Sequence, residues 1–449
     1  MAINNFINKV ELEAPISSLP GDLRVSGRIY SSGERVATIE DMGLNITVNG
    51  GFGYPLPVFI APVDYVQIST TGSAPAVGPV QTNAALWIES FDYNPAINVA
   101  TDTTLTGVSF NNLFGVKGGF SLATCNSLTG LNLPQLSTVV GNFNPSTMPA
   151  LTGFSVPQLT TVGGSFIPNT MAALTSLSLP QLTTVGGSFN PGVMAALTGF
   201  SVPQLTTVGG AFQPSTMAAL TGFSVPQLTT VGGNFNPSTM PALTGFSLPQ
   251  LTTVGGAFNP VSMAALTGFS VPQLTTVGGA FNPNGLSVLT SISMPQLVTV
   301  GGNLSSITMT SLANLNLPQL SRIGGTIAMA TTTVPALSGF SLPSITGIGS
   351  NITITPTAGN FSGLFFGTGL RNVGGNVTIT NQRLTLPSVE NILIRLAALD
   401  GTSGTTLYGA GRTVNLSGGT SAGVAALGPA ASGARAALLA RTVTVTMNA

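Results

Sequence analysis

A repeat of 23 residues is the feature of this sequence that most constrains its fold. The consensus of one copy is L-T-G-F-S-V-P-Q-L-T-T-V-G-G-x-F-N-P-x-x-M-A-A. Ten copies in register run from about residue 105 to about 327, and looser copies continue to about 380. A fixed period of this length is typical of a solenoid, in which each unit packs only against its neighbours. The prolines that mark the period are Pro134, Pro157, Pro180, Pro203, Pro226, Pro249, Pro272, Pro295 and Pro318.

The spacing within one copy predicts short strands and tight corners. Phe154 and Val156 alternate around a serine, which favours a short strand. Pro157 and Pro168 lack a donor for a sheet and belong at strand ends or corners. The pair Gly163-Gly164 predicts a second corner, because glycine adopts positive φ without a steric clash. We therefore predict a mainly β fold, a parallel β-solenoid of 23-residue coils with two or three short strands in each.

Two rows of large apolar residues recur at the same period, and we expect both to lie inside the coils. The Phe row is Phe143, Phe166, Phe189, Phe212, Phe235, Phe258 and Phe281, and the Met row is Met148, Met171, Met194, Met217, Met240 and Met263. Cys125 lies nine residues before Pro134, the place that methionine takes in the other copies. The sequence therefore predicts an inert core cysteine rather than a reactive thiol.

The repeated pattern L-x-x-F/L-x-V/L-P-x-L-x-x-V-G-G-x-F resembles the solenoids of leucine-rich-repeat and receptor-L-domain proteins. The resemblance covers about half of the chain and implies a binding or structural scaffold without a particular ligand. Two features depart from the family pattern. We find no asparagine ladder at the usual position and no cysteine-containing caps.

Charged residues are scarce, at 5% of the chain against a usual value of roughly a quarter. None lies between Gly118 and Ser321. The segment up to Lys117 carries 5 basic and 10 acidic residues, and the segment from Arg322 carries 7 basic and 2 acidic ones. The overall balance of 12 and 12 excludes a generally basic surface for nucleic acid. No window of 18 apolar residues predicts insertion into a membrane.

The composition also argues against catalysis. There is no His, which excludes His-based acid–base chemistry and His-ligated metal, and one Cys excludes an internal disulfide and a cysteine zinc cluster. Three carboxylate pairs could suggest glycoside hydrolysis. They are Glu11 and Glu13, Glu40 and Asp41, and Glu89 and Asp92. All lie outside the repeats, so we interpret them as solvated surface charge, and we predict no catalytic, cofactor-binding or metal-binding residue.

Hydroxyl side chains recur at outward positions and are the remaining functional candidates. One row is Thr152, Thr175, Thr198, Thr221, Thr244 and Thr267, a second is Ser155, Ser178, Ser201, Ser224, Ser247 and Ser270, and a third consists of Thr160, Thr161 and their equivalents. Such a surface could bind glycans. It could equally pack against identical chains, or it could simply be a neutral, soluble β surface.

The two ends differ from the repeats. Residues 1–50 predict a β stem, with a hairpin or extended strands between Gly21 and Ile39, and residues 51–104 predict a small β module. The phrases G-x-x-V-x-G and G-x-R-V-A-T in the stem resemble attachment segments of bacteriophage fibre proteins. The repeats would then fill residues 105–380.

Residues 381–449 predict an α+β cap that covers the open end of the solenoid. Its first helix would begin at Ser388 as the N-cap and stop at Gly401, and a second would run from Pro429 to Ala440. A strand at Thr442–Thr446 would follow. This tail resembles C-terminal modules that follow repeats in phage and bacterial surface proteins.

These features favour a bacteriophage virion structural protein, such as a tail fibre, spike or head decoration, located in the virion. The resemblance implies a homotrimer that contacts other virion proteins through its N-terminal segment, with a host-surface glycan as a further candidate partner. A bacterial leucine-rich-repeat-like adhesin is the alternative, but the start of the chain shows no secretory signal pattern. A polysaccharide-degrading tailspike would need carboxylates on the solenoid, and residues 118–321 have none.

Overall fold

The computed structural model describes residues 106–110, 113–306, 308–329, 336–355, 361–380, 383–418 and 421–448. It also gives the backbone of five earlier strands: β1 (Val10–Glu11), β2 (Arg28–Ile29), β3 (Tyr65–Gln67), β4 (Val80–Thr82) and β5 (Ala96–Ala100). β1 and β2 pair antiparallel, whereas β3, β4 and β5 pair in parallel with strands of the repeats or with each other. The remaining residues of the predicted stem and module lie outside the described part of the chain.

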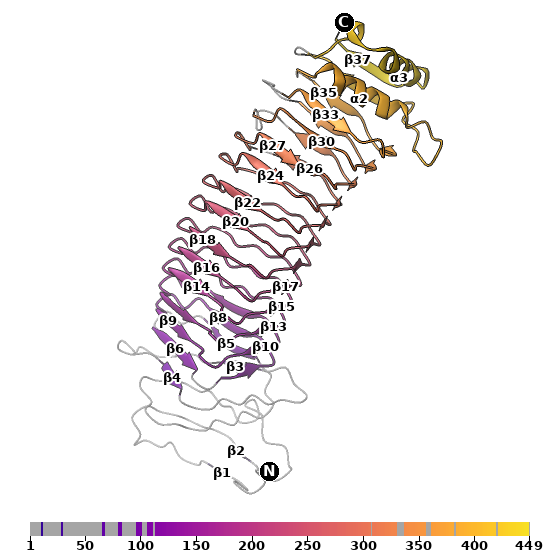
Figure 1. Cartoon of the computed structure of the whole chain (residues 1–449). Coiled ribbons are helices and arrows are strands. Elements are labelled where there is room, and N and C mark those ends of the chain that lie inside the picture. Colours follow the sequence, from indigo (N-terminus) through magenta and orange to yellow (C-terminus); the bar gives the residue numbers. More distant parts are fainter. Residues whose placement is uncertain are drawn as a thin grey trace. The chain divides into compact units, whose positions relative to one another are not determined.

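The chain divides into two compact units, one of residues 1–210 and 214–220 and the other of residues 211–213 and 221–449. In the first unit each coil contributes to three parallel sheets, so the coil has three sides (Figure 1). The first side contains β6 (Gly107–Phe110), β9 (Gly130–Asn132), β12 (Gly153–Ser155), β14 (Ser176–Ser178) and β16 (Gly199–Ser201). The second contains β7 (Gly115–Val116), β10 (Thr138–Val139), β13 (Thr161–Val162), β15 (Thr184–Val185) and β17 (Thr207–Val208). The third contains β8 (Phe120–Ala123) and β11 (Phe143–Ser146) and continues as single bridges.

The second unit has the same three sides. Its first side contains β18 (Gly222–Ser224), β20 (Gly245–Ser247), β22 (Gly268–Ser270), β24 (Ser291–Ser293), β27 (Asn314–Asn316), β30 (Gly339–Leu342) and β33 (Gly363–Phe366). Its second contains β19 (Thr230–Val231), β21 (Thr253–Val254), β23 (Thr276–Val277), β25 (Thr299–Val300), β28 (Arg322–Ile323), β31 (Gly347–Ile348) and β34 (Asn372–Val373). Its third contains β26 (Leu304–Ser306), β29 (Ile327–Met329), β32 (Ile352–Ile354), β35 (Val377–Ile379), β36 (Thr413–Leu416) and β37 (Thr444–Met447). The predicted parallel β-solenoid of 23-residue coils is thereby confirmed.

The core consists of the predicted apolar rows. Every member of the Phe row and of the Met row is buried, with at most 1% of its surface exposed. Phe166 stacks on Phe143 and on Phe189, with ring centroids 4.9 and 5.1 Å apart. Pro168 and its equivalents are buried as well, so the second proline of each coil belongs to the core rather than to a corner. The apolar side chains of each coil are therefore buried by packing against the neighbouring coils.

The glycine pair forms a corner as predicted, but for a different reason. None of these glycines is among the residues with positive φ. Instead, a Cβ added to Gly186 would overlap the carbonyl oxygen of Gly163 in the preceding coil. The amide of Gly186 donates to Val162 O at 2.8 Å. Glycine is needed because successive coils approach each other closely here, not because the backbone is left-handed.

The left-handed position lies at another corner, directly before the buried methionine. Thr147, Thr170 and Thr216 adopt φ of 57°, 56° and 54° there, and Val193 adopts 51°. In one coil the same position holds a glycine, Gly285, with φ of 67°. A β-branched residue pays a steric cost of roughly 1–2 kcal/mol in this conformation. This row could not be predicted from the repeat, because threonine is not typical of positions with positive φ.

Replacing Val193 with asparagine is expected to stabilise the protein by about 1 kcal/mol, because asparagine tolerates this conformation far better than valine does. Val193 is 40% exposed, so little buried contact is lost. A higher midpoint of thermal unfolding would show the effect. Val288→Asn is the control, because Val288 is similarly exposed at 42% and is not among the residues with positive φ. An equal gain in both variants would contradict this explanation.

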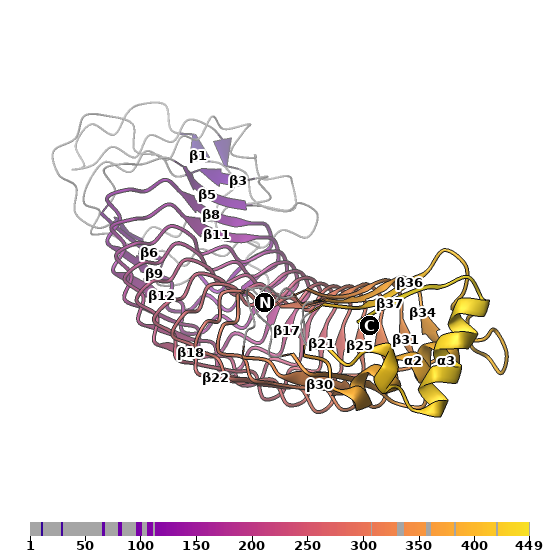
Figure 2. The same cartoon turned by 90° about the horizontal axis from the view of Figure 1, so that it is seen from above.

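Two helices follow the last coils and lie side by side (Figures 1 and 2). The second, α3 (Pro429–Ala440), has the predicted limits. The first, α2 (Leu386–Ala397), begins two residues before Ser388, with Thr385 as its N-cap, and ends before Gly401. The predicted N-cap was wrong because Pro387 already favours the first turn. The predicted final strand is present as Thr444–Met447, so it begins two residues later and ends one residue later than predicted.

Candidate binding surface

The structure places the predicted chemical candidates as follows. Of the three carboxylate pairs, the structure gives only the backbone of Glu11, in β1, and the other five residues lie outside the described part of the chain. Cys125 is fully buried in the Met row, as predicted. Within the described ranges, no group of three or more His, Cys, Asp or Glu side chains could hold a metal ion. Among the sequence-predicted functional candidates, the outward rows of the solenoid are the ones that the structure describes.

The two threonine rows link successive coils. Thr152 Oγ1 donates to Thr129 O at 3.2 Å, and Thr160 Oγ1 donates to Ser137 O at 2.9 Å. The same contact, 23 residues back along the chain, recurs for Thr183, Thr198, Thr206, Thr252, Thr267 and Thr275. The hydroxyl protons of these eight threonines are thus used within the solenoid. Their oxygens can accept hydrogen bonds from a ligand, but their donors already stabilise the stack.

A partial asparagine ladder, absent from our sequence-based prediction, lies beside the glycine corner. Asn142 Oδ1 accepts the amide of Ser165 at 2.7 Å, and Asn234 Oδ1 accepts the amide of Ala257 at 2.8 Å. Asn303 and Asn351 accept from the next coil in the same way. The position varies irregularly among asparagine, serine, alanine and threonine, so the repeat consensus concealed the ladder.

The remaining outward polar groups lie on both sides of the corner at Pro157. Ser155 ends β12, Gln158 follows the proline in the turn, and both side chains are exposed. We call the rows of these two positions the Gln–Ser surface. Its glutamines are Gln135, Gln158, Gln181, Gln204, Gln227, Gln250, Gln273, Gln296 and Gln319, and all are exposed. Glutamine recurs in nine consecutive copies although a turn that follows proline accepts most residues at this place.

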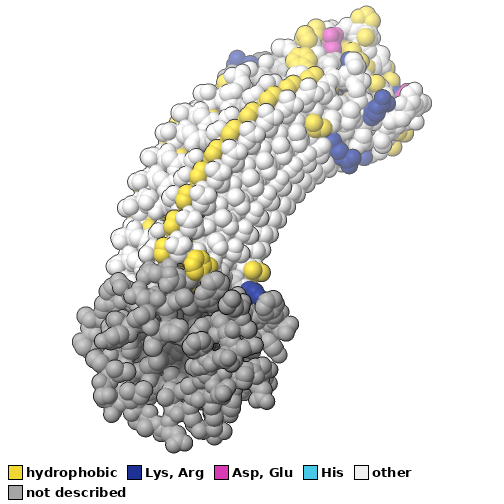
Figure 3. Space-filling model, turned by 60° about the horizontal axis from the view of Figure 1, so that its bottom comes forward, with side chains coloured by type: hydrophobic (Ala, Val, Ile, Leu, Met, Phe, Trp, Pro, Cys, Tyr) yellow, Lys and Arg dark blue, Asp and Glu magenta, His cyan; other side chains and the backbone are white. Residues whose placement is uncertain are grey.

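The Gln–Ser surface is electrically neutral. Neighbouring coils repeat about every 4.8 Å, the spacing of paired strands, so each unit presents amide and hydroxyl groups at regular intervals. Figure 3 shows dark-blue side chains only near the two ends of the described part on the face in view, with a single row of hydrophobic side chains between them. Recognition by such a surface depends on hydrogen bonds and shape, and ionic strength should affect it little.

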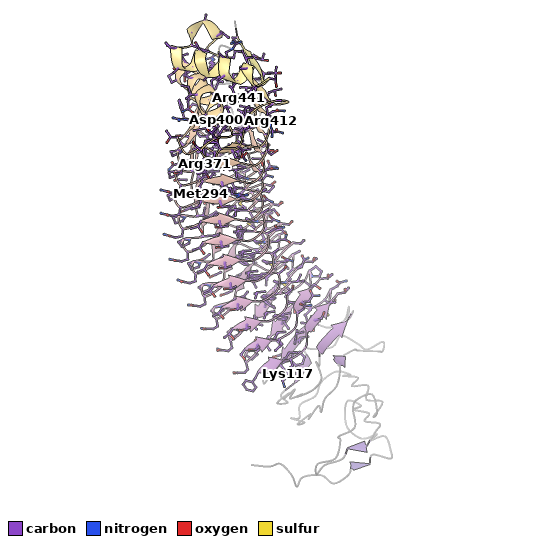
Figure 4. The ribbon with its side chains drawn as sticks, turned by 90° about the vertical axis from the view of Figure 1, so that its right-hand side faces the viewer. Lys117, Met294, Arg371, Asp400, Arg412 and Arg441 are labelled. Carbon is purple, nitrogen blue, oxygen red and sulfur yellow. The ribbon has the colours of Figure 1, made fainter. Side chains whose placement is uncertain are left out.

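Charged groups gather after the last regular coils, where Arg371, Asp400, Arg412 and Arg441 lie in one region (Figure 4). Hydrogen bonds from Thr402, first from its side chain, lower the pKa of Asp400. Burial raises the pKa of Tyr408 to about 12, and its hydroxyl donates to Thr413 O at 3.0 Å. The hydrogen bonds of both groups order the segment between α2 and β36.

Comparisons with known proteins add structural neighbours only. No protein-family model and no curated protein matches the chain. A leucine-rich repeat protein from Bacteroides ovatus is 14% identical, covers 76% of this chain and 91% of its own, and has a TM-score of 0.33. The structure of the Toll–Spatzle complex from Drosophila is 11% identical, covers 75% of this chain and 63% of that one, and has a TM-score of 0.23.

The sequence predicts no segment that inserts into a membrane, and the helices of the described part can be compared with that expectation. Each of α2 and α3 has 12 residues, and neither is long and apolar enough to cross a membrane.

Proposed function

We propose that this protein is a non-catalytic structural protein of a bacteriophage particle, and that other protein chains cover part of its solenoid in the assembled particle. One observation carries the proposal. The stretch from Gly118 to Ser321 has no charged residue although many of its side chains are exposed. Surfaces of free soluble domains usually hold roughly 25–35% charged residues. A neutral surface of this size is explained if it is covered in an assembly.

The Gln–Ser surface is the part that we assign to assembly. Its glutamines are all exposed, its serines are exposed or, at Ser201, half-buried, and both rows repeat with the same interval as the coils. A second regular β surface, including that of an identical chain, can match this interval over several coils. Homotrimer formation, which the resemblance to fibre proteins implies, belongs to this proposal. The threonine rows support glycan binding less well, because their hydroxyl protons are donated to the preceding coil.

The assignment to a phage particle rests on the N-terminal phrases that resemble fibre attachment segments. Mass spectrometry of purified particles from the host that carries the gene tests it. We expect peptides of this chain at a level comparable with known structural proteins and enriched over the cell lysate. Recovery in the bacterial envelope and absence from particles would overturn the proposal and favour a surface adhesin.

A further inference from the structure

The three sides of the solenoid end differently in the second unit. The first side ends at β33, and α2 covers its free edge. Ser388 Oγ lies 3.0 Å from Leu364 N and 3.2 Å from Leu364 O. Asn391 accepts from Phe366 N at 2.8 Å and donates to Phe366 O at 3.1 Å. Two side chains, one helical turn apart, thus satisfy the backbone groups that a further strand would otherwise bind.

The second side ends at β34 and is covered by the segment that follows α2. Thr406 N donates to Arg371 O at 2.8 Å. The guanidinium of Arg371 donates to Ser403 O at 3.0 Å and so holds the same segment. The predicted cap therefore covers these two sides, and it is held by hydrogen bonds at the last strand of each side.

The third side continues further and ends at β37, which is the last strand of its six-stranded sheet. Thr444 N donates to Arg412 O at 3.1 Å, so Thr444 faces β36. Since alternate residues of a strand point their backbone groups to opposite edges, the N–H and C=O groups of Val445 face away from β36. Within the described part of the chain, no strand pairs with that edge.

The side chains of β37 are also less completely covered than those of β36, although α3 contacts the strand. Val414 and Leu416 of β36 are buried, whereas their neighbours Val445 and Met447 are only partly buried. Leu439 of α3 is 42% exposed. The strand is nevertheless held in place, because the side chain of Asn448 accepts from Gly418 N at 2.7 Å and donates to Ser421 O at 2.8 Å. β37 is therefore an ordered edge with a partly open apolar side.

The net charge of the C-terminal region favours one kind of partner. From residue 371 onward the chain has six arginines and two carboxylates, a net charge of +4. These residues are Arg371, Arg383, Arg395, Arg412, Arg435, Arg441, Glu390 and Asp400. Residues 1–117 have 5 basic and 10 acidic residues, a net charge of −5. Two C-terminal regions would repel each other, whereas a C-terminal region and an N-terminal segment attract.

We propose that β37 of one copy binds the acidic N-terminal segment, residues 1–117, of a second copy, which adds a strand to the open edge. Main-chain hydrogen bonds to Val445 supply affinity, as in other cases of strand addition. The opposite charges of the two regions set the direction of association. The C-terminal region of one chain is thereby joined to the N-terminal segment of the next. This contact is separate from the Gln–Ser surface, and it does not depend on the assignment to a phage particle.

Sedimentation velocity of the full chain tests the proposal. At low salt the mass should rise with concentration above the 45.2 kDa of one chain, and high salt should reverse this, because salt screens the attraction. Val445→Pro removes the outward N–H and should prevent growth. Its fold should persist because Thr444, which bonds to β36, is unchanged, and an unaltered circular dichroism spectrum would verify this. Val445→Thr, which keeps the backbone donor, should associate like the wild type.

A mixing experiment determines the direction of the contact. Labelled Val445→Pro chains keep their N-terminal segment, so they should still join the end of wild-type chains. Wild-type chains that stay at one-chain mass at low salt, or Val445→Pro chains that associate among themselves like the wild type, would overturn the proposal. Neither result would affect the assignment to a virion, because that assignment is tested separately by mass spectrometry of purified particles.

Discussion

Gly186→Ala is expected to lower the free energy of unfolding by about 4 kcal/mol, which is at the upper end for a single substitution. The new Cβ would overlap the carbonyl oxygen of Gly163 in the preceding coil. Neither partner is a flexible side chain, so the two coils must move apart. This movement would weaken the 2.8 Å bonds from Gly186 N to Val162 O and from Gly187 N to Gly164 O. Denaturant or thermal unfolding followed by circular dichroism measures the loss.

Gly199→Ala is the matched control in the same unit. A Cβ at Gly199 would meet no atom within 4 Å, and serine takes the equivalent place in another coil, at Ser176. We expect a change within about 0.5 kcal/mol. Equal destabilisation by both variants would show that loss of glycine itself, rather than close approach of the coils, causes the effect.

Asn391→Ala is expected to cost about 2–3 kcal/mol, the second largest effect. The amide side chain bonds both backbone groups of Phe366 at the free edge of β33. Removing it leaves a donor and an acceptor without a partner, at roughly 1–3 kcal/mol for each buried group. Part of this cost is offset because alanine favours the helix. Unfolding experiments measure the total, and hydrogen exchange of the Phe366 amide should become faster.

Asn372→Ala provides the comparison. Asn372 makes one longer bond, from Nδ2 to Ile348 O at 3.3 Å, so its loss should cost less than about 1 kcal/mol. If Asn372→Ala proves as harmful as Asn391→Ala, or if exchange at Phe366 does not change, α2 does not stabilise the edge of β33 in the way described.

The periodicity was sufficient to predict the solenoid and the contents of its core. Residues 23 positions apart must form rows in any stack of equal coils, so the burial of Phe166 and Met171 followed from spacing and hydrophobicity alone. The helix at Pro429–Ala440 was predictable from its starting proline and its apolar spacing. These features depend on local sequence and on the repeat, and both are visible without coordinates.

Other features depend on how the coil closes, which the period does not specify. The reason for glycine at Gly186 is the distance to the preceding coil, and the left-handed φ of Thr170 is a property of one corner. Whether the hydroxyl of Thr160 donates a hydrogen bond depends on which carbonyl of the preceding coil lies next to it, here that of Ser137. Ser388 was interpreted as a helix cap from its neighbours, whereas its partner, Leu364, lies 24 residues earlier in the chain. Such contacts require the three-dimensional path.

The central claim is that the neutral solenoid is covered by other chains in an assembled particle. Quantitative mass spectrometry tests it most directly, by measuring how many copies of each variant a purified particle contains. The variant Gln158→Glu with Gln204→Glu places two charges about 10 Å apart on the Gln–Ser surface. Ala172→Glu with Ala218→Glu places two charges at another exposed corner. We predict that the wild type and the alanine-row variant are incorporated and that the glutamine-row variant, though folded, is depleted at least tenfold, which corresponds to about 1.4 kcal/mol. Absence of the wild type from particles, or equal incorporation of all three, would contradict the account.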